Sequence, residues 1–345
     1  MKILYLLPLL KNTGPSNVVV SLVNGMKNTN HKIIICTFLG VEDNYQDIFS
    51  NSNVTIIELS GFNLKSWVAL WKLIKKEKVD VLHSHGLLPD LASAALSLVS
   101  TAKNISTVHC NLRDNYKNEY QYPKGFIYYR LHKLALFFIK KITYVSTSIT
   151  SSSSDTVIYN GISKKESTII TSDTINLIYA GRLIPSKNIA FLLDCLSYIN
   201  SHTDKKIILH VYGDGEMLPF LTKQALPNVI FYGFVKNYLK SIPENAIMIN
   251  PSLFEGMPMA VLEALSAGMP VALSKIPPHH EINNNINCGI ALFDNTPQSF
   301  QSAIQSLINN DGQIDFNKSQ MADQFACKFS DTSMVNQYLT AYSSL

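Results

Sequence analysis

Short apolar runs rich in valine and isoleucine recur along the whole chain, and stretches with helical spacing separate them. The runs are continuous rather than alternating, as in parallel strands that are covered on both faces. Regular alternation of such strands with helices predicts βαβ units, and hence doubly wound α/β sheets. The predicted strands are residues 2–7, 32–38, 54–59, 79–84, 105–109 and 142–146, and in a second series 156–159, 175–180, 206–212, 228–232, 246–250, 270–273 and 289–293.

The length of 345 residues favours two domains over one. A polar stretch that is poor in core residues lies between about residues 147 and 174, and the strand pattern restarts at Ile175. We therefore predict a first domain over residues 1–155 and a second over residues 170–328.

The composition excludes several classes of protein. Apolar residues make up 46% of the chain, enough for two cores, and the net charge of +4 is too small to indicate a nucleic-acid partner. The five cysteines show no Cys-x-x-Cys spacing, which indicates neither a disulfide framework nor a zinc site and fits a reducing cytosol. Residues 2–10 are apolar but lack the cleavage site of a secretory signal, and no run approaches the ~18 apolar residues of a spanning helix.

Two further segments have the spacing of amphipathic helices. Residues 331–345 place three large side chains on one face and predict a terminal helix that packs on another element. Residues 122–141 are aromatic and basic, so they either contact an anionic membrane surface or pack on a sheet while their cations reach solvent. The cations of that segment are Lys124, Arg130, Lys133, Lys140 and Lys141.

The strongest functional signal is the stretch from residue 250 to residue 274. Glu255 lies on the turn after a predicted strand, and the helix that follows carries Glu263. Ligands bind at the carboxyl ends of strands in open α/β sheets, and helix N-termini favour phosphate. Eight helical residues rise roughly 12 Å, whereas the two carboxylates of a glycoside hydrolase lie about 5–9.5 Å apart. The pair therefore suits an extended, hydroxyl-rich ligand better than hydrolysis, although Glu263 alone is also consistent with a solvated helix surface.

Two more loops follow predicted strands. Arg182 and Lys187 flank a turn before a helix, which suits a diphosphate clamp as well as an ordinary surface loop. Gly213-Asp214-Gly215 follows the next strand and by itself indicates no more than a turn. It lacks the G-x-G-x-x-G spacing of a dinucleotide-binding fingerprint.

Histidines follow the predicted strands of the first half. His83, His85 and His109 lie at or beyond strand ends, where a hydrogen-bonding role in a cleft is favoured over metal binding because no carboxylate or cysteine accompanies them at ligand spacing. Residues 279–281 form a further polar set after two prolines, which fits a surface loop or a ligand contact equally.

Taken together, the segments YAGRLIPSKN, YGDGE, YGFV and PSLFEGMPMAVLEALSAGMPVALS resemble glycosyltransferase family 4, whose members are retaining GT-B enzymes that use nucleotide-sugar donors. The first half resembles the family more loosely, through TGPS, HSHG, STVH, YVS and VIYNGI. The resemblance implies two Rossmann-like domains that face an interdomain cleft, an acceptor domain followed by a donor domain, with the final helix crossing back to the first.

The resemblance also implies a role for each candidate residue. Arg182 and Lys187 would hold the donor diphosphate, Glu263 would bind the ribose hydroxyls, and Glu255 would contact the donor sugar. His109 would lie near the reacting sugar. Further positions implied in donor binding are Gly14, Gly181, Gly213, Gly256 and Met257.

The implied activity is transfer of a hexose-type sugar from a UDP- or GDP-sugar to a hydroxyl acceptor with retention, without an essential metal or other cofactor. The implied setting is synthesis of bacterial capsule, O-antigen or exopolysaccharide on a lipid-linked or oligosaccharide acceptor, in the cytoplasm or at the inner membrane surface. Where the family has a double glycine followed by an acidic residue, this chain has Thr13-Gly14-Pro15-Ser16. Two alternatives therefore stay open: a sugar-nucleotide epimerase of similar fold, and a non-catalytic partner of another transferase.

Overall fold

A computed structural model describes residues 1–27, 29–42, 45, 48–49, 54–150, 152–165, 169–170, 174–202, 206–309 and 313–345. The chain divides into two compact units, one formed by Met1–Gly161 with Asp331–Leu345 and the other by Ile162–Ser330. In the polar stretch between the two strand series, Ser151, residues 166–168 and residues 171–173 lie outside the described residues.

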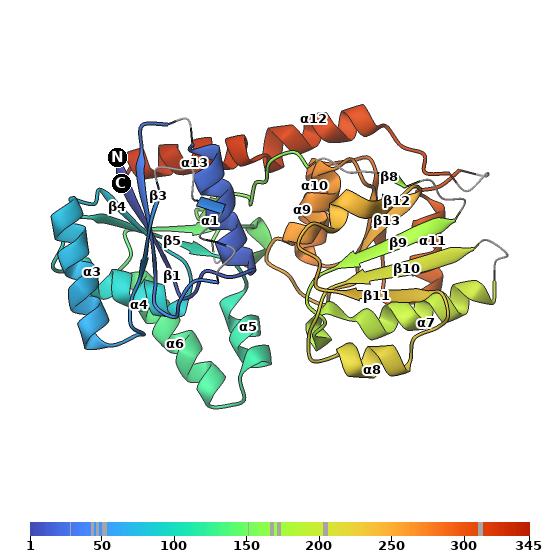
Figure 1. Cartoon of the computed structure of the whole chain (residues 1–345), viewed down its shortest axis with the longest axis horizontal. Helices are drawn as coiled ribbons and strands as arrows, with labels where there is room; N and C mark the ends of the chain where they lie inside the picture. Colours follow the sequence, from blue (N-terminus) through green and yellow to red (C-terminus); the bar gives the residue numbers. More distant parts are fainter. Residues whose placement is uncertain are drawn as a thin grey trace. The chain divides into compact units, whose positions relative to one another are not determined.

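The first unit is built on a seven-stranded parallel sheet with the order β3-β2-β1-β4-β5-β6-β7. Leu4 pairs with Ile34 on one side and with Leu82 on the other, and all three are buried in one apolar cluster. Because the runs are apolar on both faces, helices cover both sides of the sheet (Figure 1). The strands are β1 (Lys2–Leu7), β2 (Lys32–Thr37), β3 (Val54–Glu58), β4 (Val81–Ser84), β5 (Lys103–Val108), β6 (Lys141–Tyr144) and β7 (Thr156–Val157).

The position of β7 corrects the sequence analysis, which assigned residues 156–159 to the second series. Thr156 pairs with Thr143 at the edge of the first sheet, and the N–H of Ile158 donates to the carbonyl of Tyr144 over 2.9 Å. The segment follows β6 by only a short connection within the polar stretch, so it remains within reach of β6 and extends that edge.

The helices of the first unit surround this sheet. The terminal helix α13 packs on α1, where a Cβ on Gly25 would lie 2.7 Å from Val335 and only glycine leaves room. Tyr338 and Tyr342 of α13 are buried and reach polar groups of the sheet, so hydrogen bonds fix the helix as well as apolar contacts. The helices are α1 (Gly14–Gly25), α3 (Leu64–Glu77), α4 (Leu87–Leu96), α5 (Leu112–Glu119), α6 (Lys124–Phe137) and α13 (Asp331–Ser343), with a 3-10 turn at Thr147–Ile149.

Helix α6 is shorter than the predicted segment 122–141. It ends at Phe137 because the chain must then enter β6, where Lys141 is the first residue. The side chain of Lys140 donates to the carbonyl of Leu345, and that of Lys141 to Ser344 Oγ over 2.8 Å. These two cations therefore hold the end of the chain and do not belong to the helix. Among the described residues, no helix has both the length and the apolar character needed to cross a membrane.

The second unit repeats the same topology with six parallel strands in the order β11-β10-β9-β13-β14-β15. Leu177 pairs with Leu209 and with Ile247, and these side chains share a buried cluster with α7. The prediction of doubly wound parallel α/β domains is confirmed in both units. The strands are β9 (Ile175–Ala180), β10 (Ile207–Tyr212), β11 (Val229–Gly233), β13 (Ala246–Asn250), β14 (Val271–Ser274) and β15 (Ile290–Phe293), beside a small pair formed by β8 (Ile169–Ile170) and β12 (Ile242–Pro243).

Helices also lie on both faces of the second sheet (Figure 1). They are α7 (Ile189–Asn200), α8 (Leu218–Lys223), α9 (Met259–Ser266), α10 (Pro277–Asn285), α11 (Pro297–Gln305) and α12 (Lys318–Phe329), with 3-10 turns at Pro185–Lys187 and Tyr238–Ser241.

Candidate functional site

The candidate site of the second unit lies at the carboxyl ends of β9 and β13. These strands are neighbours, and the strand order reverses between them, which is where open α/β sheets bind ligands. The loop after β9 carries Lys187, and the loop after β13 carries Glu255. The N–H of Leu253 donates to the carbonyl of Ser186 over 2.9 Å, so the backbones of the two loops are joined directly.

Lys187 and Glu255 form an ion pair. Lys187 Nζ lies 2.5 Å from Glu255 Oε1, and the two side chains are only 19% and 12% exposed. The same oxygen accepts a hydrogen bond from Ser252 Oγ over 2.8 Å. Burial by itself would raise the pKa of the Glu255 carboxyl, but Lys187 and Ser252 outweigh it and hold that pKa below its usual value. Glu255 is therefore ionised at neutral pH.

Arg182 differs from Lys187 in having no such partner. Its side chain is exposed, and in the described part of the chain no acidic group lies within ion-pair distance of it. Its carbonyl accepts a hydrogen bond from the buried Tyr179 hydroxyl over 2.9 Å, which fixes the backbone but leaves the guanidinium without a partner among the residues that the structure describes. Of the two predicted clamp cations, one is thus ready for an anion and the other is engaged by Glu255.

Gly181 and Gly213 are in direct backbone contact. A Cβ added to Gly213 would lie 1.8 Å from the carbonyl oxygen of Gly181, so no other residue fits without moving the loop. The N–H of Gly181 donates to the carbonyl of Tyr212, and that of Gly213 to the carbonyl of Gly233. The Gly-Asp-Gly turn is therefore a close approach that sets the path of the chain leading to Arg182.

The N-terminus of α9 is the third component of this edge. The helix begins at Met259 with Pro258 as its N-cap, and no side chain of the described residues caps its first turn. Gly256 and Met257 are buried immediately before it. Uncapped N–H groups and the helix dipole favour a bound anion at such a terminus.

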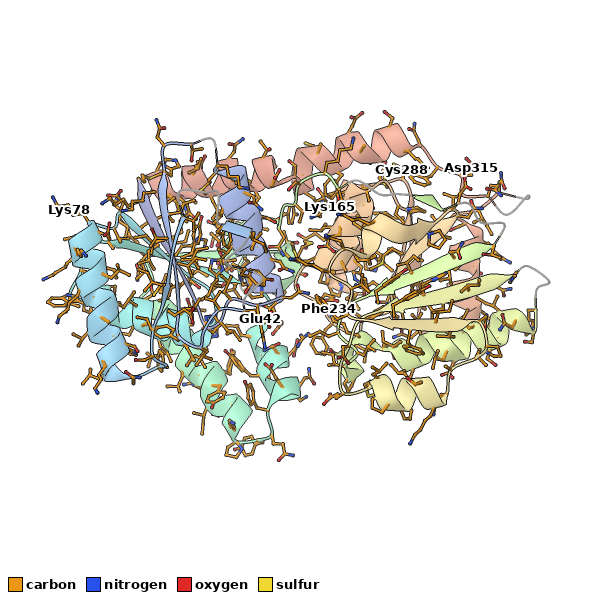
Figure 2. All side chains as sticks on the ribbon, viewed as in Figure 1. Glu42, Lys78, Lys165, Phe234, Cys288 and Asp315 are labelled. Carbon is orange, nitrogen blue, oxygen red and sulfur yellow. The ribbon has the colours of Figure 1, made fainter. Side chains whose placement is uncertain are left out.

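Glu263 lies on α9 and has an environment opposite to that of Glu255. No hydrogen bond or ion pair reaches its carboxylate from the described residues. Burial raises the pKa of Glu263, although Lys165, which is labelled in Figure 2, opposes the shift. A carboxylate without a partner is costly inside a protein. Glu263 is thus available to accept hydrogen bonds from a ligand.

Sequence reasoning missed a group of residues behind Glu255. Residues 277–285 form α10, so His279 lies on a helix and not on the expected loop. His279 is fully buried, donates from Nδ1 to the carbonyl of Ser274 over 2.7 Å, and leaves Nε2 without a partner among the described residues. Ser274 Oγ in turn donates to the carbonyl of Ser252 over 2.6 Å. Burial lowers the pKa of His279 to about 4, so this support is uncharged. The available signal was the position of Ser274 at the end of β14, the neighbour of β13.

The histidines of the first unit form a separate buried network. His85 Nδ1 lies 2.8 Å from His109 Nε2, and both follow the ends of adjacent strands, β4 and β5. His83 is a core residue rather than a ligand contact, because it is fully buried between Tyr342 and Thr107 at 2.7 Å each. Burial lowers the pKa of His83 and of His109 to about 3, so both rings are neutral at physiological pH.

Gly14 is the first residue of α1. A Cβ there would meet none of the described atoms within 4 Å, and the backbone is not left-handed, so neither space nor strain requires glycine at this position. Gly14 and His109 belong to the first unit, whereas the other predicted site residues belong to the second. Throughout the described residues, no three histidine, cysteine or acidic side chains converge as a metal-binding group.

Comparisons with known proteins concern the family and the fold of the chain. The family model described as Glycosyl transferases group 1 matches residues 174–310, and the model of Glycosyltransferase Family 4 matches residues 12–166. The capsular polysaccharide biosynthesis glycosyltransferase CapH of Staphylococcus aureus is 25% identical over 86% of this chain and 88% of its own. The Escherichia coli UDP-Gal:alpha-D-GlcNAc-diphosphoundecaprenol alpha-1,3-galactosyltransferase is 26% identical over 73% of this chain and 71% of its own.

Solved structures share the fold at low identity. Anabaena HepE in complex with UDP-glucose superposes with a TM-score of 0.78 at 16% identity, and the match covers 100% of both chains. The sucrose-phosphate synthase of Thermosynechococcus elongatus gives a TM-score of 0.79 at 14% identity and covers 100% of this chain and 99% of its own.

Because Lys187 holds Glu255 in its ionised form, we expect the stability difference between wild type and a Lys187 variant to depend on pH. Lys187→Met removes the cation but keeps the burial, so the pKa of Glu255 rises above its usual value and the folded state loses about 1–3 kcal/mol at pH 7. A carboxyl whose pKa is lower in the folded state than in the unfolded state stabilises the folded state at pH values above its unfolded pKa. That stabilisation is lost as the pH falls through its folded-state pKa. The deficit relative to wild type should therefore shrink at pH 4, as measured by urea unfolding.

Lys275→Met is the matched control. Lys275 pairs with Asp294 over 2.6 Å, but the two side chains are 41% and 58% exposed, so its loss should change stability by less than about 1 kcal/mol. A Lys187→Met deficit equal to that of the control, or one that does not depend on pH, would contradict the assignment.

Proposed function

Because this chain belongs to the group 1 glycosyltransferases of the GT-B fold, we propose that it transfers a hexose-type sugar from a UDP- or GDP-sugar to a hydroxyl acceptor with retention at the anomeric carbon. The observation that carries the proposal is the grouping of Lys187, Glu255 and the uncapped start of α9 where the strand order reverses. Those groups offer positive potential to a diphosphate beside an acceptor for sugar hydroxyls.

The Lys187–Glu255 ion pair must open when the donor binds. An entering diphosphate competes with Glu255 for Lys187, while Arg182 is already unpaired. Once Lys187 contacts phosphate, Glu255 is released to accept hydrogen bonds from sugar hydroxyls. Lys187 and Glu255 thereby each exchange an internal partner for the donor, which limits the desolvation cost of binding.

The chemical step breaks the bond between the anomeric carbon and the diphosphate oxygen. The bonding electrons leave with the nucleoside diphosphate, whose developing charge Arg182, Lys187 and the α9 amides stabilise. The acceptor hydroxyl forms the new bond on the same face of the sugar, and its proton passes to the departing diphosphate oxygen. We assign no nucleophile on the protein and no metal ion to this step, and His109 is proposed to contact the reacting sugar as a neutral ring.

The proposed biological role is synthesis of a bacterial surface polysaccharide, such as capsule, O-antigen or exopolysaccharide. The names of the relatives support it, since they include a capsular polysaccharide enzyme, an O-antigen enzyme and a transferase to a diphosphoundecaprenol acceptor. A lipid-linked acceptor would place the protein at the cytoplasmic face of the membrane; an oligosaccharide acceptor is the alternative.

A donor screen tests the function directly. The protein is incubated with UDP- and GDP-hexoses, first alone and then with diphospholipid-linked and oligosaccharide acceptors, and nucleoside diphosphate and sugar products are measured. Release of nucleoside diphosphate with one donor supports the proposal. Return of an epimerised donor, or absence of nucleotide binding, would support the epimerase or the non-catalytic partner instead.

Arg182 provides the sharpest test of the diphosphate clamp. Arg182→Ala should lower kcat by about 10²-fold, as loss of one donor to a developing negative charge commonly does. Its thermal unfolding midpoint should not change, because the side chain is exposed and unpaired. Lys275→Ala, another exposed cation on a loop after a strand, serves as the control and should retain its activity. Unchanged turnover in Arg182→Ala would remove the residue from the mechanism.

The two glutamates should separate in their effects. Glu263→Gln should weaken binding of both the free nucleoside diphosphate and the intact donor, because the residue lies about one turn along α9 from the phosphate end. Glu255→Gln should not weaken binding of the nucleoside diphosphate, since it only frees Lys187, but it should slow sugar transfer. Each loss should amount to about 1.5–3 kcal/mol. Calorimetric titration beside steady-state kinetics measures both, and the reverse pattern would exchange the two roles.

Activity should survive treatment with EDTA followed by dialysis, because the cations and the α9 terminus supply the positive potential at the diphosphate. Donor turnover is measured before and after treatment, with and without added Mg²⁺ or Mn²⁺. Loss of turnover that either metal ion restores would contradict the proposed mechanism.

A further inference from the structure

Helix α6 is apolar on both of its faces. Its inner face is buried against α4 and α5, through Gly125, His132, Ala135 and Leu136. A polar contact fixes the rotation of the helix, since His132 Nε2 lies 2.7 Å from Asp90 Oδ2 and Nδ1 lies 2.9 Å from the Tyr116 hydroxyl. Asp90 also accepts from Ser84 Oγ over 2.6 Å. The other face of α6 therefore points away from the core of its unit.

That outer face carries two adjacent stripes of side chains. An ordinary surface helix is polar on its outer face. Here, large apolar side chains are exposed on that face, with exposed fractions from 39% at Leu131 to 81% at Phe137. We define the α6 outer face as the stripe Phe126, Arg130, Lys133 and Phe137 together with the stripe Ile127, Leu131, Leu134 and Phe138.

The charges on this face all have one sign. Arg130 and Lys133 are exposed within the first stripe, and Lys124 lies at the start of the helix over the Tyr120 and Tyr128 rings. No aspartate or glutamate occurs between Glu119 and Asp155. Large apolar side chains interleaved with cations, and without an acidic residue, complement an anionic lipid surface. A second copy of the same face would bring like charges together.

We propose that the α6 outer face is a docking surface for an anionic lipid bilayer. Its phenylalanine and leucine side chains enter the boundary between headgroups and acyl chains, and its cations contact lipid phosphates. Docking at a bilayer would bring the enzyme to a lipid-linked acceptor, and the biological role of this surface therefore rests on the proposed function. The binding itself requires neither a donor nor turnover.

Vesicle flotation of the full chain tests the proposal. Wild type should bind vesicles of phosphatidylcholine mixed with phosphatidylglycerol, and bind phosphatidylcholine alone more weakly. Arg130→Gln with Lys133→Gln should reduce partitioning to the anionic vesicles about 30-fold, because each cation near such a surface contributes about 1 kcal/mol. Phe126→Ser with Phe137→Ser should reduce binding to both kinds of vesicle, and added salt should not restore it.

Matched controls come from helix α3 and from other exposed apolar residues. Lys65→Gln with Lys72→Gln makes the same charge change on exposed lysines of another helix, and Leu64→Ser with Leu98→Ser removes exposed apolar side chains elsewhere. Both controls should bind vesicles like wild type. Equal losses in the controls, or no binding by wild type, would overturn the proposal.

Two measurements keep this proposal separate from the proposed function. Nucleoside diphosphate binding in the absence of lipid should be the same in wild type and in the α6 variants. A variant that loses vesicle binding but still binds nucleotide tests only the docking surface. A protein that binds vesicles but shows no donor turnover contradicts only the proposed function. Light scattering measures oligomeric state, and a wild-type dimer that the Phe126→Ser and Phe137→Ser changes dissociate would assign the face to self-association instead.

Discussion

The adjacency of β9 and β13 is the constraint from which the arrangement of the second unit's polar residues follows. The chain makes β9, then adds β10 and β11 on one side and β13 to β15 on the other, so the loops after β9 and β13 leave the sheet side by side. The Leu253–Ser186 backbone hydrogen bond joins the two loops, and the contact of Gly213 with Gly181 fixes the start of the first loop. Together these contacts bring Lys187 to Glu255.

The buried ion pair is better explained by binding than by stability. Taking both charges out of water costs nearly as much as their attraction returns, so an apolar pair of similar volume would stabilise the fold equally well or better. The carboxylate also receives Ser252, while Ser274 and the neutral His279 fix the loop beneath it. Such a shell holds Glu255 ionised and oriented without a ligand, as preorganised sites require.

How much of this could be predicted from sequence depended on the range of the forces involved. The strands and their parallel pairing followed from local apolar runs. The positions of Arg182, Lys187 and Glu255 after strand ends made them candidates, whereas their roles were implied only by the family resemblance. The end of α6 at Phe137 did not, because it depends on where β6 must begin beside β5. The edge position of β7 depends likewise on a partner strand. Nothing local distinguishes His279 from its exposed neighbour His280, since only the contact with Ser274 buries it.

The opposite pKa shifts of Glu255 and Glu263 also could not be predicted from local sequence. Glu255 precedes a short apolar helix and Glu263 lies on it, but only tertiary contacts give the two carboxyls different environments.

Two units of one topology carry different chemistry at the carboxyl edges of their sheets. In the first unit, the carboxyl ends of β4 and β5 present His85 and His109, which burial keeps neutral. In the second, the ends of β9 and β13 present an unpaired guanidinium, a lysine and an ionised carboxylate. A departing nucleoside diphosphate needs charge to be stabilised, whereas a sugar needs uncharged hydrogen-bonding partners. The electrostatics of the two edges therefore support the proposal that the second unit holds the leaving group and that the first contacts neutral, hydroxyl-bearing groups.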